Sequence, residues 1–255
     1  SVFSPHLITS NTFGNSVSLF SACINNQVEK IVFCSSMARY GHQEKTPFSE
    51  DLIPKPQDPY GIAKLAAETV LEELCSTHDV SFSIAIPHNI IGPRQKYDDP
   101  FRNVAAIFIN LMLQNRQPII YGDGSQIRCF SFVKDVVDPL TIMCDPKLVK
   151  SEIINVGPDE GSVTILELAE LIAKKLNFDL SPIFLPDRPR EVKVATCSAK
   201  KARELLNYQT TTSLSDGLDS MITYIDSRGP LPFRYHLPIE ISNALTPKSW
   251  IEKLF

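Results

Sequence analysis

Lys30-Ile-Val-Phe-Cys-Ser-Ser-Met-Ala-Arg-Tyr-Gly41 begins as a short apolar, β-branched run and ends in polar residues. Such a run is typical of a strand that is buried on both faces of a parallel sheet. Pro59, a residue favoured in the first turn of a helix, precedes a segment with helical periodicity at residues 60–76. A second short apolar run follows at residues 81–86. The order strand, helix, strand predicts a βαβ unit with parallel strands.

The alternation of helices and strands extends in both directions from this unit and indicates the α/β class. A turn at Gly122-Asp-Gly124 separates two strand-like runs, so we expect these two strands to be joined by a tight connection. The further predictions are helices at 11–26, 101–115, from 133, 164–176 (capped by Thr164), 198–206 and 213–227, and strands at 118–121, 127–132, 152–156 and 182–185.

The charge balance of the chain excludes some classes of partner. The 255 residues are 43% hydrophobic and 21% charged, and the formal net charge is −4. That balance is ordinary for a globular protein and provides no basic surface for nucleic acid or for an anionic membrane. No apolar stretch is long enough to cross a bilayer. If the ligand is an anion, we therefore expect individual arginines to hold it.

The cysteines indicate the redox compartment. Six of them are scattered through the chain, without a CxxC pair and without metal-like spacing to the five histidines. Several lie in apolar runs, where reduced cysteines act as small core residues. This pattern predicts a reducing, cytoplasmic location and no metal site.

Tyr60 and Lys64 are one helical turn apart and lie on the same face of the predicted helix. A free tyrosine has a pKa near 10, and a nearby ammonium group would lower it enough for the phenol to accept a proton. Ser35 and Ser36 end the preceding strand, at the edge where open α/β sheets bind ligands. Taken singly, the Tyr-Lys pair also fits a solvated helix face, and the serine pair fits a turn at the end of a strand.

Seven motifs in sequence order resemble the extended short-chain dehydrogenase/reductases of the nucleotide-sugar epimerase/dehydratase type, close to UDP-glucose 4-epimerases. The two most specific are a strand ending in Ser-Ser-x-x-x-Tyr-Gly and a helix opening with Pro-Tyr-x-x-x-Lys. Seven motifs in order are far more specific than any one of them. In this sequence the motifs are Asn11-x-x-Gly14, Ser35–Gly41, Pro59–Lys64, Asn89-Ile-Ile-Gly-Pro-Arg-Gln95, Tyr121-Gly-Asp-Gly-Ser-Gln-Ile-Arg128, Phe132-Val-Lys-Asp-Val136 and Arg188-Pro-Arg-Glu191.

The resemblance assigns roles to residues and implies NAD as cofactor. It places Arg128 and Arg188 where family members contact the nucleotide-sugar diphosphate, and guanidinium groups from separate loops suit that anion. Arg190 replaces a common glycine and would add a further phosphate contact. The resemblance implies Ser36, Tyr60 and Lys64 as catalytic residues; Asn11, Ser35, Tyr60, Lys64 and Pro87 as cofactor-binding residues; and Asn89, Arg128 and Arg188 as substrate-binding residues.

The glycine-rich cofactor turn of this family has no counterpart in the sequence. No two of the ten glycines are three residues apart, so no GxxG exists. We therefore expect the first nucleotide-binding half of the fold to be missing, leaving a partial Rossmann-type parallel sheet and a smaller α/β substrate-binding domain. We expect residues 1–86, with a returning strand near 151–157, to form the first part and residues 87–255 mainly the second.

The resemblance favours a UDP-hexose 4-epimerase that works through a 4-keto intermediate. Related 4,6-dehydratases usually carry Thr-Asp-Glu where this sequence has Ser35-Ser-Met37, so the acid needed for elimination of water is not evident. Two alternatives stay open: such a dehydratase, and a non-catalytic module that binds sugar nucleotides. The family resemblance also implies a homodimer formed by the helices at residues 13–24 and 60–74.

Overall fold

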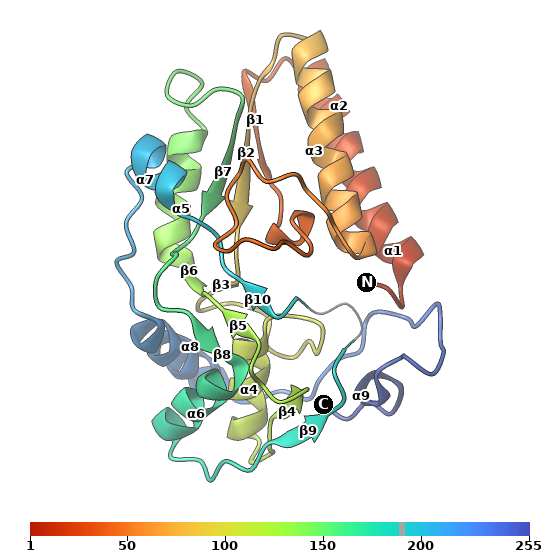
Figure 1. Ribbon diagram of the computed structural model, residues 1–255, viewed down its shortest axis with the longest axis vertical. Helices are drawn as coiled ribbons and strands as arrows, with labels where there is room; N and C mark the ends of the chain where they lie inside the picture. The colour runs from red at the N-terminus through yellow and green to blue at the C-terminus, as the bar shows by residue number, and fades with distance from the viewer. Residues whose placement is uncertain (189–191) are drawn as a thin grey trace.

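The computed structural model describes residues 1–188 and 192–255, and a three-stranded parallel sheet forms its upper part (Figure 1). The strands are β1 (Lys30–Cys34), β2 (Ser81–Pro87) and β7 (Glu152–Val156), in the order β1-β2-β7. Both pairings are parallel, so the predicted βαβ unit is confirmed. In the central strand Ile84, Ala85 and Ile86 are all 0% exposed, as expected of a strand that is covered on both faces.

One face of the sheet is covered by α2 (Asn15–Asn25) and α3 (Pro59–Thr77). Asp58 caps α3 by accepting a hydrogen bond from the Gly61 backbone N–H at 2.8 Å, and Pro59 occupies the first turn. Ala67, Leu71 and Cys75 follow at intervals of four residues and are at most 1% exposed. The helix predicted at 11–26 is longer than expected: α1 (Pro5–Thr9) and a π-helical turn (Ser10–Gly14) precede α2.

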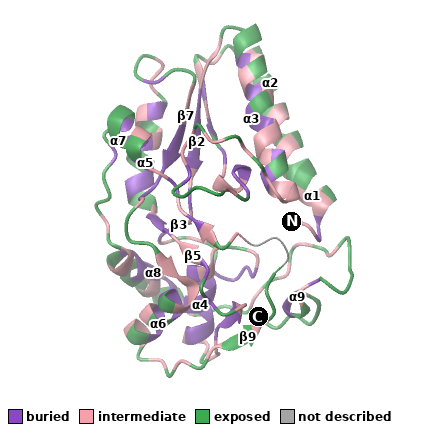
Figure 2. Ribbon diagram, viewed as in Figure 1, coloured by how far each residue is buried: buried purple, intermediate pink, exposed green. Residues whose placement is uncertain are grey.

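The opposite face of the sheet is covered by α5 (Val133–Met143) and α7 (Lys200–Leu206). Met143, Ala202 and Leu206 are buried and pack with residues of β2 and β7. The sheet is therefore sandwiched between two helical layers, and its buried strands stand out between the helices in Figure 2.

The lower part of the molecule is built on α4 (Val104–Leu113), α6 (Ile165–Leu176) and α8 (Leu214–Arg228). Every residue of α4 from Ala105 to Met112 is buried, because α6 and α8 both pack against it. Thr164 caps α6 as expected, and the structure adds the reciprocal bond from Glu167 that completes a capping box. Short strands complete this part: β3 (Ile90–Ile91) pairs with β6 (Ser131–Phe132), β4 (Ile119–Tyr121) with β9 (Ile183–Leu185), and β5 (Ile127–Arg128) with β8 (Val163–Thr164) and β10 (Val194–Ala195).

The strands predicted at 118–121 and 127–132 are joined by a tight connection, as expected, but they do not pair with each other. Gly122 and Gly124 do form a turn with positive φ angles of 65° and 79°. The Gln126 side-chain amide then donates a hydrogen bond to the Tyr121 carbonyl at 2.7 Å. In a hairpin this carbonyl would instead accept from the backbone of the neighbouring strand. Instead β4 pairs with β9, and the second run divides into β5 and β6 with separate partners.

A long C-terminal segment with one short helix, α9 (Lys248–Ile251), runs back from α8 toward the first residues of the chain. We call residues 230–255 the strap. Among the helices that the structure describes, none is long and apolar enough to cross a membrane. The division of the chain at residue 86 stays a prediction.

Candidate active site

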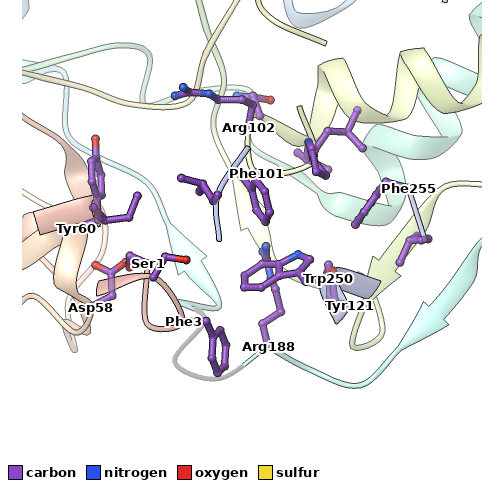
Figure 3. A pocket seen from close by; sticks show the side chains of 18 of the residues that line it. Ser1, Phe3, Asp58, Tyr60, Phe101, Arg102, Tyr121, Arg188, Trp250 and Phe255 are labelled. Carbon is purple, nitrogen blue, oxygen red and sulfur yellow. The ribbon is translucent and has the colours of Figure 1, made fainter. Parts of the chain in front are cut away.

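A cavity of about 940 Å³ lies between the sheet and α4, with a smaller one of about 350 Å³ beside it. Tyr60 lines the larger cavity and Ser36 the smaller one. Asn89, Arg128 and Arg188 line both, so all three predicted substrate-binding residues meet at the junction of the two cavities. Figure 3 shows the larger cavity, with Tyr60 on one side and Tyr121 and Arg188 on the other.

Ser36 and Tyr60 are brought together by the end of β1 and the start of α3. Ser36 has an extended backbone and accepts a hydrogen bond from the Ala38 N–H at 3.2 Å, which fixes its side chain at the sheet edge. The Ser36 hydroxyl lies close enough to the Tyr60 hydroxyl to affect the pKa of the phenol. Burial raises the pKa of Tyr60 above its ordinary value, although the Ser36 hydroxyl opposes this rise.

Lys64 lies one turn further along α3, but its ammonium group does not bond to Tyr60. Nζ donates to the Cys34 carbonyl at 2.8 Å and lies 4.8 Å from the centre of the Phe33 ring and 6.0 Å from that of Tyr60. Burial lowers the pKa of Lys64. The expectation that Lys64 lowers the pKa of Tyr60 is therefore wrong for this arrangement, because the ammonium group is bonded to the Cys34 carbonyl at the end of β1.

Ser35 takes part in a buried network that the sequence did not reveal. Its hydroxyl donates to the Glu68 carboxylate, and the Arg39 Nε lies 2.9 Å from the other Glu68 oxygen. The Arg39 and Glu68 side chains are only 5% and 2% exposed. The Arg39–Glu68 contact is an ion pair outside hydrogen-bond geometry. The sequence contained one indication of this network: Glu68 follows Lys64 by four residues and so lies on the same face of the helix.

The predicted substrate-binding residues come from three separate segments. Asn89 has a positive φ of 45° and donates to the Cys129 carbonyl at 2.9 Å. Arg128, in β5, donates to the Ile127 carbonyl at 2.8 Å. The Arg188 guanidinium lies 4.7 Å from the centre of the Tyr121 ring. The rest of the Arg188 motif, including Arg190, falls at 189–191, outside the described residues.

Two further cofactor-binding predictions have different surroundings. Asn11, in the π-helical turn, lines the larger cavity. Pro87 ends β2 opposite Val156 and, in the part of the chain that the structure describes, lines neither cavity. The neighbouring His88 is 1% exposed and bonds through Nε2 to the Pro158 carbonyl at 2.9 Å, so its role is structural.

The sequence pattern of the NAD dependent epimerase/dehydratase family matches residues 1–157. The chain belongs to this family. Its family relatives include an uncharacterised UDP-glucose epimerase of Bacillus subtilis (30% identity over 213 residues, 82% of this chain) and a UDP-glucose 4-epimerase of Mycolicibacterium smegmatis (32% over 204 residues, 79% of this chain). This chain spans 64% of the length of each.

A solved structure of this family shows the same fold. The UDP-glucose 4-epimerase of Thermotoga maritima, solved with UDP-glucose, is 30% identical and superposes with a TM-score of 0.83. The match covers 89% of this chain and 73% of that one. The predicted α/β fold with its Rossmann-like parallel sheet is therefore confirmed.

The residues present fit one end of an NAD molecule. Asn11 and Tyr60 line the larger cavity, and Lys64 lies on the same helix face as Tyr60, an arrangement that suits the nicotinamide ribose. For the cofactor pyrophosphate, the printed sequence contains no glycine-rich turn of the family type.

Proposed function

We propose that the whole protein is an NAD-dependent UDP-hexose 4-epimerase that works through a 4-keto sugar. The observation that carries this proposal is that Tyr60 and Ser36 lie close together beside two adjoining cavities, both of which are also lined by Arg128 and Arg188. A proton-transfer group and two cations for a diphosphate therefore lie at one site. The activities of the relatives, which are named as UDP-glucose epimerases, support the choice of substrate.

In this mechanism Tyr60 accepts the proton of the sugar C4 hydroxyl and Ser36 holds that oxygen by a hydrogen bond. NAD, when bound, supplies the hydride acceptor and donor. Because burial raises the pKa of Tyr60, proton acceptance requires Lys64 to turn from the Cys34 carbonyl toward the phenol. After the sugar has turned within the cavity, Tyr60 returns the proton to the oxygen of the C4 epimer.

Arg128 and Arg188 would hold the diphosphate from opposite segments of the chain, which fixes the sugar relative to Tyr60. A charge-assisted hydrogen bond contributes about 1.5–3 kcal/mol, so removal of one arginine has a measurable effect.

Replacing Arg188 with methionine is expected to weaken the binding of UDP-glucose by about 10- to 100-fold. Isothermal titration calorimetry measures this change directly. Arg234→Met is the matched control: Arg234 is 73% exposed, pairs with Asp98 at 3.3 Å and is not among the residues that line the two cavities. Equal affinity in the two variants would contradict the proposal that Arg188 binds the diphosphate.

A non-catalytic sugar-nucleotide-binding module is the second candidate, and one observation favours it. The pKa of Tyr60 is raised and Lys64 bonds to a strand carbonyl, so the pair is not arranged for proton transfer as it stands. A 4,6-dehydratase has less support. Asp58 lines both cavities, but its carboxylate accepts bonds from the Gly61 N–H at 2.8 Å and the Ser1 hydroxyl at 2.5 Å.

The three candidates differ in their products. We expect incubation of the protein with UDP-glucose and NAD to yield UDP-galactose, detected by separation of the sugar nucleotides. A 4-keto-6-deoxy product would instead identify a dehydratase. Calorimetric binding of UDP-glucose without any product would favour the binding module.

We further propose a homodimer formed by α2 and α3, and a cytoplasmic location. These two helices pack against each other, and they expose Leu19 (62%) and Ile62 (53%). Exposed apolar side chains on neighbouring helices suit a helical interface.

A further inference from the structure

The strap crosses the site and is held first by the opening residues of the chain. The Glu240 backbone N–H donates to the Phe3 carbonyl at 2.8 Å. The Glu240 carboxylate accepts hydrogen bonds from the His6 and Leu7 backbone N–H groups at 2.8 and 2.9 Å. These donors lie in the first turn of α1, where a carboxylate is favoured.

The far end of the strap is held by the lower part of the molecule. The Ser249 hydroxyl bonds to the Tyr121 hydroxyl at 2.5 Å, and the Arg116 guanidinium donates to the Leu254 carbonyl at 2.8 Å. Ser249 is 0% exposed. The strap is thus attached on both sides of the larger cavity, and its residues His236, Leu237, Ile239, Trp250 and Phe255 line that cavity.

Trp250 is the strap residue that lies at the junction of the two cavities. It lines both cavities, and its ring meets Phe3 and Phe101 edge-on at centroid distances of 5.8 and 5.5 Å. Figure 3 shows its indole between Phe101 and Arg188. Within residues 1–188 and 192–255, no hydrogen bond uses its indole N–H. Two aromatic neighbours therefore hold, beside Arg128 and Arg188, a ring whose donor has no partner in the described protein.

We propose that Trp250 is a ligand-contact residue of the sugar-nucleotide site, with its indole N–H donating to the diphosphate beside the two arginines. The strap then forms a third wall of the pocket, in addition to the sheet edge and α4. This inference rests on the proposed function, because it takes a UDP-sugar as the ligand. An N–H donor aimed at a phosphate oxygen makes a strong, charge-assisted bond, and the indole ring excludes water from it.

Trp250 is the only tryptophan of the chain, so its fluorescence reports on this one position. We expect titration with UDP-glucose to change the Trp250 emission. The midpoint of this change should equal the midpoint of UDP-glucose binding measured by calorimetry. Trp250→Phe keeps an aromatic ring for Phe3 and Phe101 but removes the donor, and we expect it to weaken UDP-glucose binding about 10-fold. Leu245→Ala is the control within the strap: Leu245 is 67% exposed, and we expect unchanged affinity.

The outcomes separate this inference from the proposed function. Calorimetric binding of UDP-glucose with unchanged emission, and with equal affinity in the wild type and Trp250→Phe, would overturn the contact and leave the proposed substrate in place. Failure of the wild type to bind either UDP or UDP-glucose would overturn the proposed substrate class and this inference with it. Thermal unfolding of Trp250→Phe verifies that the strap variant is folded.

Discussion

Replacing Tyr60 with phenylalanine is expected to reduce the rate of UDP-glucose epimerisation by about 100- to 10,000-fold, because a positioned proton-transfer group contributes that much. The ring stays, so the cavity wall and the start of α3 are preserved. The affinity for UDP-glucose is expected to change little, since the arginines supply most of the attraction for the diphosphate. Product formation from UDP-glucose with added NAD measures the rate, and calorimetry measures the affinity.

Tyr224→Phe is the matched control for this loss. Tyr224 lies in α8, with its ring next to Arg228, and is not among the residues lining the two cavities. It loses the same hydroxyl group far from the site, so its rate is expected to equal that of the wild type. Full activity of Tyr60→Phe would mean that another group moves the proton.

The second large effect concerns stability: Arg39→Met is expected to lower the free energy of unfolding by about 3–5 kcal/mol. The substitution leaves the Glu68 carboxylate, 2% exposed, without its cationic partner. Urea denaturation at neutral pH measures the loss. The double variant Arg39→Met with Glu68→Met removes both charges, so we expect it to recover much of the lost stability. Equal losses in the two variants would show that the ion pair is not the cause.

The destabilisation by Arg39→Met should depend on pH in a definite direction. Burial already raises the pKa of Glu68 above its ordinary value of 4.5, and Arg39 opposes that rise. In the variant, the folded-state pKa therefore lies still further above the unfolded-state value. A raised carboxyl pKa gives stability that is present below pH 4.5 and is lost as the pH rises through the folded-state pKa. The free energy of unfolding of the variant should thus be closest to that of the wild type when urea titrations are made at mildly acidic pH.

The sequence predicted the elements that have a strong local signal. The strand that ends at Cys34, the helix that begins at Pro59 and the cap at Thr164 were all predicted from the apolar pattern and from helix-start residues. The motif order also placed Asn89, Arg128 and Arg188 at one site, and the structure brings all three to both cavities.

Features that depend on distant contacts could not be predicted in this way. The pairing of β4 with β9 joins segments about 60 residues apart in the chain. The glycine turn that follows β4 instead favoured pairing with the next strand along the chain. The orientation of Lys64 depends on the Cys34 carbonyl and the Phe33 ring, which spacing along a helix does not specify. The strap has few periodic residues, so nothing in its composition indicated that it lines a pocket.

The attachment of the strap to the first helix also bears on the order in which the molecule folds. Glu240 and His6 are 234 positions apart, whereas α3 and its flanking strands join within a few dozen residues. Distant contacts form only after the intervening chain has become compact, because each must overcome the entropy of closing a long loop. The ligand pocket is therefore completed late in folding, after the sheet that carries its proton-transfer groups.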